Sequence, residues 1–372
     1  MRKAFQAAAA LAAVALVAAG CAKPSSTTTG SGSGSGSGAA KFTGCMVTDT
    51  GGINDKSFNQ SSWQGMQAAA AADKNITVKY LPSTTTSDYA KNISTFESQK
   101  CGIIVTVGFL MGAATEAAAK ANPHQKFAIV DCSYASFCLS TKAHPPIAHN
   151  VKQLVFNTVQ DAFLGGYLAA GMTKTGKVAT YGGMKFGTVT IYEDGFWDGV
   201  QYYNKQHHTH VQVLGWSYPS QNGTFAGSFT NITAGETIGN TFIHDGADII
   251  FPVAGGVGLG TAKAVQTADT SGKNVAMYWV DTDGCVSAAT YCKYFVTSVE
   301  KGISTAVKTA VLLAAHGHSG GSYVGTLQNG GAVLAPFHDW ASKVPASLQS
   351  ELNTVKQDII SGKIVPATKS PV

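Results

Sequence analysis

From residue 42 onward the chain alternates short apolar runs with longer stretches of helical character. Such an alternation is typical of parallel sheets whose two faces are covered by helices. We expect strands at 43–47, 77–80, 103–107, 126–130, 148–151, 177–181, 211–216, 249–253, 276–280 and 294–299. We expect helices at 63–72, 89–99, 113–120, 156–172, 193–204, 233–245, 260–268 and 303–315.

The number of strands indicates more than one sheet, because ten strands in about 330 residues exceed what one compact sheet usually holds. We therefore expect an α/β fold in which residues 41–372 form two doubly wound, Rossmann-like lobes around a cleft. One lobe would comprise about 41–150 with part of 285–330, and the other about 151–284 with part of the C-terminal region. Ligands of open parallel sheets lie beyond the carboxyl ends of the strands, so polar residues just after strands are the first binding candidates.

Residues 1–20 have the three parts of a secretory signal peptide, namely a basic start, an apolar stretch at 7–19 and small residues at the end. The apolar stretch is shorter than a bilayer-spanning helix, and it runs directly into Cys21. The run Val-Ala-Ala-Gly-Cys that ends there resembles a lipobox, with alanine where leucine is usual. We expect cleavage and lipidation at Cys21, and the alternative is a plain secreted product.

The segment 21–40 is a tether that contains four Ser-Gly repeats. Such a sequence buries nothing and stays flexible, and about 17 residues of it reach roughly 20–25 Å. The anchor and the tether together predict a monomeric domain held at the outer face of a bacterial cytoplasmic membrane.

Six cysteines remain after Cys21, and an even number in an exported chain suggests disulfides. Two pairs are close in sequence and flank loops after predicted strands, Cys132 with Cys138 and Cys285 with Cys292. The remaining pair is Cys45 with Cys101, both at strand starts. The competing interpretation is a zinc site, although no two of these cysteines have the two-residue spacing of a zinc knuckle.

The most distinctive motif is the run Asp-Thr-Gly-Gly-Ile-Asn-Asp-Lys-Ser-Phe-Asn-Gln at 49–60, between the first strand and the first helix. Its paired glycines permit a tight turn, and Ser57 or Asn59 can cap the helix. Phe58 is unusual in a polar loop. It either fills a gap in the core or presents its ring to a ligand.

This run resembles the signature of the basic membrane protein (BMP) family, the nucleoside-binding lipoproteins of ABC transporters that include a spirochaetal purine-nucleoside receptor. The resemblance covers almost the whole folded part and continues at 127–131, 163–171, 181–184, 193–196, 227–231, 246–251, 254–260, 280–283 and 297–301. It implies a type I periplasmic-binding-protein fold, a nucleoside ligand with a purine base, and the permease of an ABC transporter as partner. A sugar-binding or sensory module of the same fold is the alternative.

A nucleoside offers a flat base and a ribose with hydroxyls, so its site needs aromatic faces and ionised groups. The resemblance implies that Phe58 and Phe229 sandwich the base, while Asn59 contacts its edge and Gly255 lies in the glycine-rich loop of the cleft. Carboxylates that follow strands can accept hydrogen bonds from the ligand, and these are Asp49, Asp131 and Asp281. Lys301 resembles the family's cleft lysine. The alternatives are a core role for the rings, a turn or cap role for each aspartate and for Asn59, and a solvent-facing lysine.

Other classes of function find little support. The glycines at 254–260 lack the spacing of a dinucleotide fingerprint, and no catalytic triad order, phosphate loop or paired-carboxylate motif is present, so we expect no enzyme and no cofactor. His207, His208 and His210 lie in a short polar link and are expected in solvent rather than on a metal. The net charge of +5 is spread without a dense basic run, so nucleic acid is not an expected partner.

Overall fold

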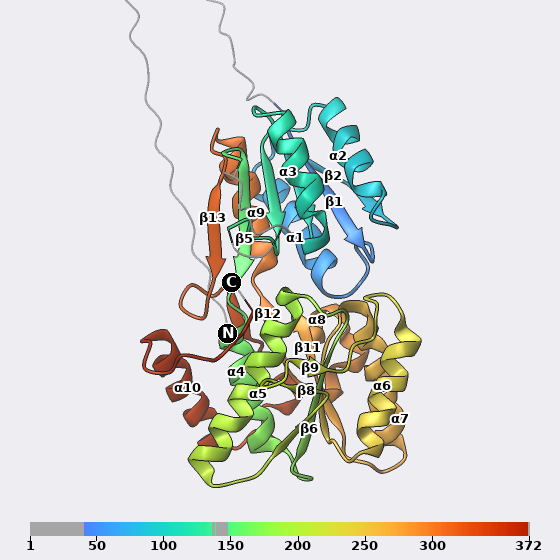
Figure 1. The fold of residues 1–372 in the computed structure, drawn as a ribbon, viewed down its shortest axis with the longest axis vertical. Helices are drawn as coiled ribbons and strands as arrows, with labels where there is room; N and C mark the ends of the chain where they lie inside the picture. Colours follow the sequence, from blue (N-terminus) through green and yellow to red (C-terminus); the bar gives the residue numbers. More distant parts are fainter. Residues whose placement is uncertain (1–40, 136–137, 139–147, 371–372) are drawn as a thin grey trace, which may run out of the picture. The chain divides into compact units, whose positions relative to one another are not determined.

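The computed structural model describes residues 41–135, 138 and 148–370, which are built on two six-stranded sheets (Figure 1). The predicted signal peptide, Cys21 and the tether lie outside the described residues. No helix within the described ranges is long and apolar enough to cross a membrane.

The first sheet is entirely parallel and has the order β13-β5-β4-β3-β1-β2. Its strands are β1 (Phe42–Thr50), β2 (Ile76–Ser83), β3 (Ile103–Val107), β4 (Phe127–Val130), β5 (Val151–Phe156) and β13 (Gly321–Gly325). Helices α1 (Phe58–Ala72) and α9 (Ile303–Ala315) pack on one face, and α2 (Asp88–Ser98) and α3 (Gly112–Ala121) pack on the other.

The second sheet has the order β14-β12-β11-β10-β6-β7, and only β14 is antiparallel to its neighbour. Its strands are β6 (Lys177–Gly182), β7 (Gln212–Leu214), β10 (Ile249–Val253), β11 (Ala276–Asp281), β12 (Phe295–Lys301) and β14 (Ala332–Leu334). Helices α4 (Val159–Met172), α5 (Gly187–His207) and α10 (Ala346–Ile360) cover one face. Helices α6 (Ile232–His244) and α7 (Gly258–Thr270) cover the other (Figure 1).

Burial on both faces explains why the central strands are continuous apolar runs. Every residue of β3, β10 and β11 is buried, and these strands are rich in β-branched and aromatic side chains. Strands with one wet face would instead alternate between apolar and polar residues. The doubly wound α/β fold predicted from the sequence is therefore confirmed.

The two sheets divide the chain at positions that differ from the expected lobe boundaries. The strand β5 pairs with β4, so the first lobe continues past residue 150 to Phe156. The strand β12 pairs with β11, so the chain returns to the first lobe only after Lys301, at α9. It crosses a third time between β13 and β14. Strand pairing decides these boundaries, and pairing partners are far apart in sequence.

Local chemistry explains two shifted strands. The strand expected at 148–151 starts later because the buried Asn150 side chain donates to the carbonyls of Ala119, Asn122 and Gln125. The strand expected at 211–216 stops at Leu214, since Gly215 has φ +83° and a Cβ there would lie 2.1 Å from the Thr180 carbonyl oxygen. Only glycine fits such a position.

Among the elements that the sequence interpretation missed are β13, β14 and α10, and it began α5 six residues late, at 193 instead of Gly187. The two strands are short and lie at sheet edges, where apolar patterning is weak.

Three disulfides join the predicted partners, and this prediction is confirmed. They are Cys45–Cys101, Cys132–Cys138 and Cys285–Cys292. The first links β1 to Cys101, which lies two residues before β3. The second lies in the segment that follows β4. The third joins Cys285, in the short helix α8 (Gly284–Ser287), to Cys292.

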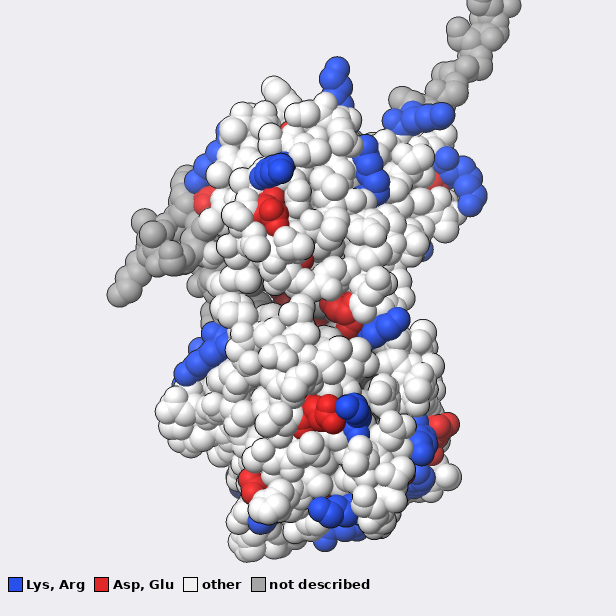
Figure 2. All heavy atoms as spheres, turned by 90° about the vertical axis from the view of Figure 1, so that its right-hand side faces the viewer, with Lys and Arg blue, Asp and Glu red and all other residues white. Residues whose placement is uncertain are grey.

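Charged side chains are dispersed over the face of the molecule in Figure 2, with lysines and acidic residues interspersed. On this face they form no continuous basic surface of the kind that binds nucleic acid.

Candidate functional site

A pocket with about 680 Å³ of space not filled by protein atoms, its open mouth included, is lined by residues from elements of both sheets. The structure brings all eight residues predicted to bind ligand into this lining, namely Asp49, Phe58, Asn59, Asp131, Phe229, Gly255, Asp281 and Lys301. Among the lining residues that sequence reasoning missed are Asp55, Phe109, Phe186 and Tyr192.

The charged lining residues come from the carboxyl ends of strands. Asp281 and Lys301 are the last residues of β11 and β12, and Asp131 directly follows β4. Asp131 and Asp281 have positive φ angles of 60° and 67°. Non-glycine residues rarely adopt this left-handed conformation, although aspartate tolerates it better than most. The folded chain thus holds both carboxylates in an unusual backbone geometry, which is often found at functional sites.

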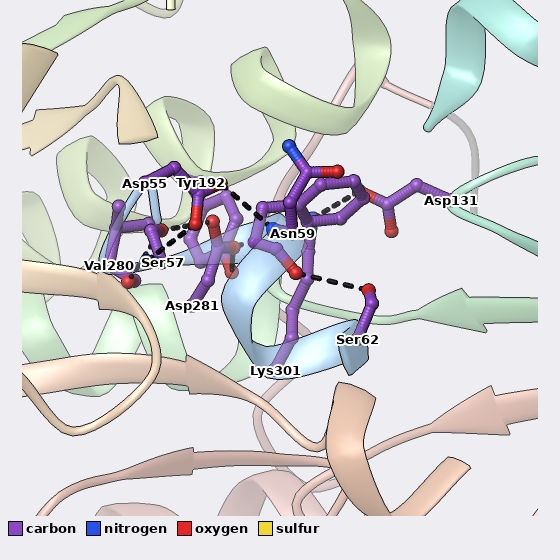
Figure 3. Close-up of polar contacts among 10 residues, drawn as sticks. Asp55, Ser57, Asn59, Ser62, Asp131, Tyr192, Val280, Asp281 and Lys301 are labelled. Atoms are coloured by element: carbon purple, nitrogen blue, oxygen red, sulfur yellow. Dashed lines mark hydrogen bonds and ion pairs between the residues drawn. The ribbon is translucent and has the colours of Figure 1, made fainter. Parts of the chain in front are cut away.

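Lys301 is buried between two of these carboxylates (Figure 3). Its Nζ lies 2.5 Å from Asp131 Oδ2 and 3.8 Å from Asp281 Oδ1. Burial opposes the charged form of the amine, but the two carboxylates together hold the pKa of Lys301 above its usual value of 10.5. The alternative of a solvent-facing lysine is therefore wrong, because Lys301 is only 6% exposed.

Two aromatic rings flank the same ammonium group. Nζ of Lys301 lies 5.4 Å from the centroid of the Phe58 ring and 5.1 Å from that of Tyr192. The Tyr192 hydroxyl donates to Asp281 Oδ1 at 3.0 Å. Tyr192 is fully buried on α5, so it fixes the carboxylate from the side opposite to the first sheet's residues. A buried tyrosine within a helix gives no sequence signal of this role.

Ser57 does not cap α1 as one interpretation of the sequence expected. Its hydroxyl donates to Asp281 Oδ2 at 2.8 Å and to the Val280 carbonyl at 3.1 Å, so it joins the first lobe to the second. Asp55 provides the cap, because its carboxylate accepts from the backbone amides of Ser57, Asn59 and Gln60. Aspartate is a favoured cap residue, so this signal was present in the sequence.

Asn59, which is buried, and Asp49, which is partly exposed, form a polar pair in the pocket wall. Asn59 Nδ2 donates to Asp49 Oδ1 at 2.9 Å, while Asn59 Oδ1 has no hydrogen-bond partner among the described residues. The cap role for Asn59 is thus wrong. Burial, with added repulsion from neighbouring carboxylates, raises the pKa of Asp49 to about 8. A carboxyl group that holds its proton at neutral pH can donate a hydrogen bond as well as accept one.

Three phenylalanines form a row at the pocket. The rings of Phe109 and Phe186 are 5.3 Å apart between centroids, and those of Phe186 and Phe229 are 6.4 Å apart, each pair at 32°. Gly183 makes room for this row, since a Cβ there would lie 2.4 Å from the Phe229 ring. Phe58 both packs at the edge of the first lobe's core and lines the pocket, so the two interpretations of this residue are compatible.

Gly255 lies in the loop after β10 and has φ +54°, a conformation that favours glycine. It opens a short 3-10 turn, Gly255–Val257, which leads into α7. The glycine-rich loop therefore carries its backbone to the pocket, as the family resemblance implies.

One cluster among the described residues has side chains of the kinds that bind metal ions. Asp283, Cys285 and His338 place possible ligand atoms within 4.8 Å of one another. The Cys285 sulfur is bonded to Cys292 and is not a thiolate, and His338 Nε2 already lies 2.7 Å from Asp283 Oδ2. The histidines at 207, 208 and 210 are exposed, as the sequence predicted, and His207 contacts Glu351 at 3.0 Å.

Two doubly wound lobes, connected by three crossings and sharing one aromatic and polar pocket, define a substrate-binding protein with the type I periplasmic fold. The family model described as "ABC transporter substrate-binding protein PnrA-like" matches residues 42–370. The chain belongs to this family, the Bmp family, as the sequence resemblance predicted. It is an ABC transporter substrate-binding protein.

Relatives and solved structures agree with this assignment. The chain is 31% identical over 374 residues to the ABC transporter nucleoside-binding protein BmpA of Lactococcus lactis subsp. cremoris, with 97% of each chain covered. It is 27% identical to basic membrane protein A of Borreliella burgdorferi, with 86% of each covered. A solute-binding protein from Aeropyrum pernix K1 has a TM-score of 0.76 at 23% identity, covering 89% of this chain and 94% of that one, which supports the fold.

Proposed function

We propose that the pocket binds a nucleoside, with a purine base favoured, and that the protein delivers it to the permease of an ABC transporter. The observation that carries this proposal is the combination of aromatic rings, an amide–carboxyl pair and an ionised cluster in one pocket. The Lactococcus relative is named as nucleoside-binding, which supports the same ligand class.

The base would occupy the aromatic part of the pocket, where the exposed faces of Phe58 and Phe229 offer stacking surfaces. The Asp49–Asn59 pair offers a protonated carboxyl donor and an amide oxygen with no partner among the described residues. A neighbouring donor and acceptor match the alternating groups on the edge of a purine.

The ribose would contact the Lys301 cluster, because hydroxyls both donate and accept hydrogen bonds. Asp131 and Asp281 provide charged acceptors, and Lys301 provides a charged donor. These groups already contact one another across the two lobes, as expected of a two-lobed binding protein whose lobes close around a ligand.

The charge of the pocket argues against nucleotides. Among the described residues of the lining, Lys301 alone has a cationic side chain, and two carboxylates already neutralise it. Asp55 adds further negative charge. A phosphate group would therefore meet carboxylates without a free cation, which costs several kcal/mol in a partly dry site.

The proposal includes an anchor at Cys21, which would hold the domain outside the cytoplasmic membrane. It also holds that the ligand is released chemically unchanged, since we assign no catalytic group. Recovery of intact nucleoside after prolonged incubation with the protein tests this second point, and formation of free base and ribose would contradict it.

Titration calorimetry on residues 41–372 tests the ligand. We expect binding of adenosine, guanosine or inosine, weaker binding of cytidine and uridine, and no measurable binding of AMP. Ribose and adenine alone are the matched controls. Binding of ribose as tight as that of any nucleoside would favour the sugar-binding alternative and contradict the proposal.

A further inference from the structure

Residues 367–370, here called the strap, lie along α5 after the chain has left α10. The Ala367 amide donates to Asp198 Oδ2 at 2.8 Å. The Thr368 hydroxyl and the Lys369 amide donate to Asp194 Oδ2 at 2.8 and 2.9 Å. Finally, the Ser370 and Thr190 hydroxyls lie 2.6 Å apart. The strap thus contacts α5 over two full turns. It runs antiparallel to the helix, since later residues of the strap contact earlier residues of α5.

The contacts of the strap form one stripe on α5. Thr190, Asp194 and Asp198 are four residues apart, so they lie on the same side of the helix. Thr188 and Tyr192, which line the pocket, lie roughly 140° around the axis from this stripe at 3.6 residues per turn. The strap therefore holds the back of the helix whose front forms part of the pocket wall.

Asp194 extends the support to a second part of the wall. It is fully buried, and its Oδ1 accepts from Trp216 Nε1 at 3.1 Å and from Gln221 Nε2 at 2.8 Å. From Gln221 the chain continues to Phe229. The segment between these two residues is anchored by the hydrogen bond from the Ala226 amide to the Gly182 carbonyl. One carboxylate with four donors thus connects α5, the segment that leads to Phe229, and the strap.

Burial makes the loss of these hydrogen bonds costly. Thr190 and Ser370 are 6% and 7% exposed, so their hydroxyls have little access to water if the strap leaves. A buried carboxylate that loses donors is also costly. Without the strap, the first turns of α5 would therefore be free to shift toward positions in which water satisfies these groups.

We propose that the strap is a positioning element for the pocket, so that its loss weakens ligand binding without unfolding the lobes. The strap acts on the pocket through α5. This helix carries Thr188, Val189 and Tyr192 to the pocket, and Phe186 directly precedes it. Tyr192 in turn holds Asp281. The inference rests on the proposed function only for the choice of nucleoside as probe.

The test compares the wild-type protein with two variants. Thr368→Val/Ser370→Ala changes only strap side chains and removes their hydroxyl donors. Deletion of residues 367–372 removes the strap. Lys363→Ala is the matched control, because it lies in the same C-terminal segment but pairs with Asp358 on α10 and contacts no strap partner.

Two readouts distinguish positioning from stability. Hydrogen–deuterium exchange on the ligand-free full chain should show the amides of 188–193 exchanging about tenfold faster in the deletion, and the control unchanged. Calorimetry with inosine and adenosine should show about threefold weaker binding for the double variant and about tenfold for the deletion, at a temperature where all variants are folded.

Unchanged exchange in α5 would overturn the proposal whatever the ligand is. Faster exchange with unaltered affinity would show that the strap stabilises α5 without positioning the pocket, and this too would overturn it. If the wild-type protein bound no nucleoside, the proposed function would fail, while the exchange measurement would still decide whether the strap holds α5.

Discussion

Lys301→Met removes the one cation that the described part of the chain contributes to the pocket lining, while keeping an apolar side chain of similar length. In the wild-type structure the ammonium lies between Asp131 and Asp281 and over the rings of Phe58 and Tyr192. Methionine can pack against the rings, but it leaves two buried carboxylates, 6% and 7% exposed, without their counter-charge. Removal of one partner from a buried ion pair costs about 3–5 kcal/mol.

The pH dependence follows from the direction of the shift. The pKa of Lys301 in the folded protein lies above its ordinary value of 10.5. Its stabilising contribution is therefore fully present below pH 10.5 and is lost only as the pH rises through the folded pKa. At pH 7 the wild-type protein has the whole contribution. Burial raises the pKa of Asp131, and Lys301 opposes that rise. In the variant Asp131 therefore takes up a proton more readily, so the loss of stability should shrink as the pH falls toward about 4.5.

Urea unfolding of the ligand-free domain at pH 7 and pH 4.5 measures both effects. Lys363→Met is the matched control, because Lys363 pairs with Asp358 at 2.8 Å but is 71% exposed, and we expect no measurable change from it. A loss below about 1 kcal/mol for Lys301→Met at pH 7, or a loss that is equal at both pH values, would refute the view that Lys301 is a buried cation held by two carboxylates.

Three further predictions concern the ligand and the anchor. Phe229→Ala should weaken nucleoside binding by about tenfold to a hundredfold, since stacking on an aromatic face contributes roughly 1–3 kcal/mol. Phe58→Ala should weaken binding by the same factor and also lower the melting temperature, because Phe58 packs against the core. Wild-type affinity of both variants in calorimetry would rule out stacking. Nucleoside binding should weaken as the pH rises past about 8, where Asp49 loses its proton. An Asp49→Asn protein titrated at pH 6.5 and 9 should show no such loss of affinity. A wild-type affinity that is the same at both pH values would mean that the Asp49 carboxyl does not donate to the ligand. Cys21→Ser should release the protein from membranes in cell fractionation, and a variant that stays in the membrane fraction would contradict lipidation.

The sequence by itself determined the class of fold and most of the pocket. The run Ile249–Val253 is apolar throughout, and Ile103–Val107 is apolar except for Thr106, as strands buried on both faces require. Because parallel strands present their carboxyl ends at one edge, residues that follow strands, such as Asp131 and Gly255, could be assigned to a shared site before any contact was known. The family resemblance added Phe58 and Phe229, whose roles no local pattern reveals.

Only the tertiary structure decided which distant residues satisfy one another. Ser57 looks like a helix cap in sequence, yet its hydroxyl bonds Asp281, 224 residues away. The strap shows the same limit, since Thr368 finds its acceptor at Asp194 through packing of α5 and the C-terminal segment. Hydrogen bonds of this kind depend on where two folded elements place their atoms within about 3 Å. Local residue propensity carries no information on distances between elements that are far apart in the sequence. Hydrophobic periodicity therefore specifies the helices and strands, and tertiary packing specifies which residues form hydrogen bonds between them.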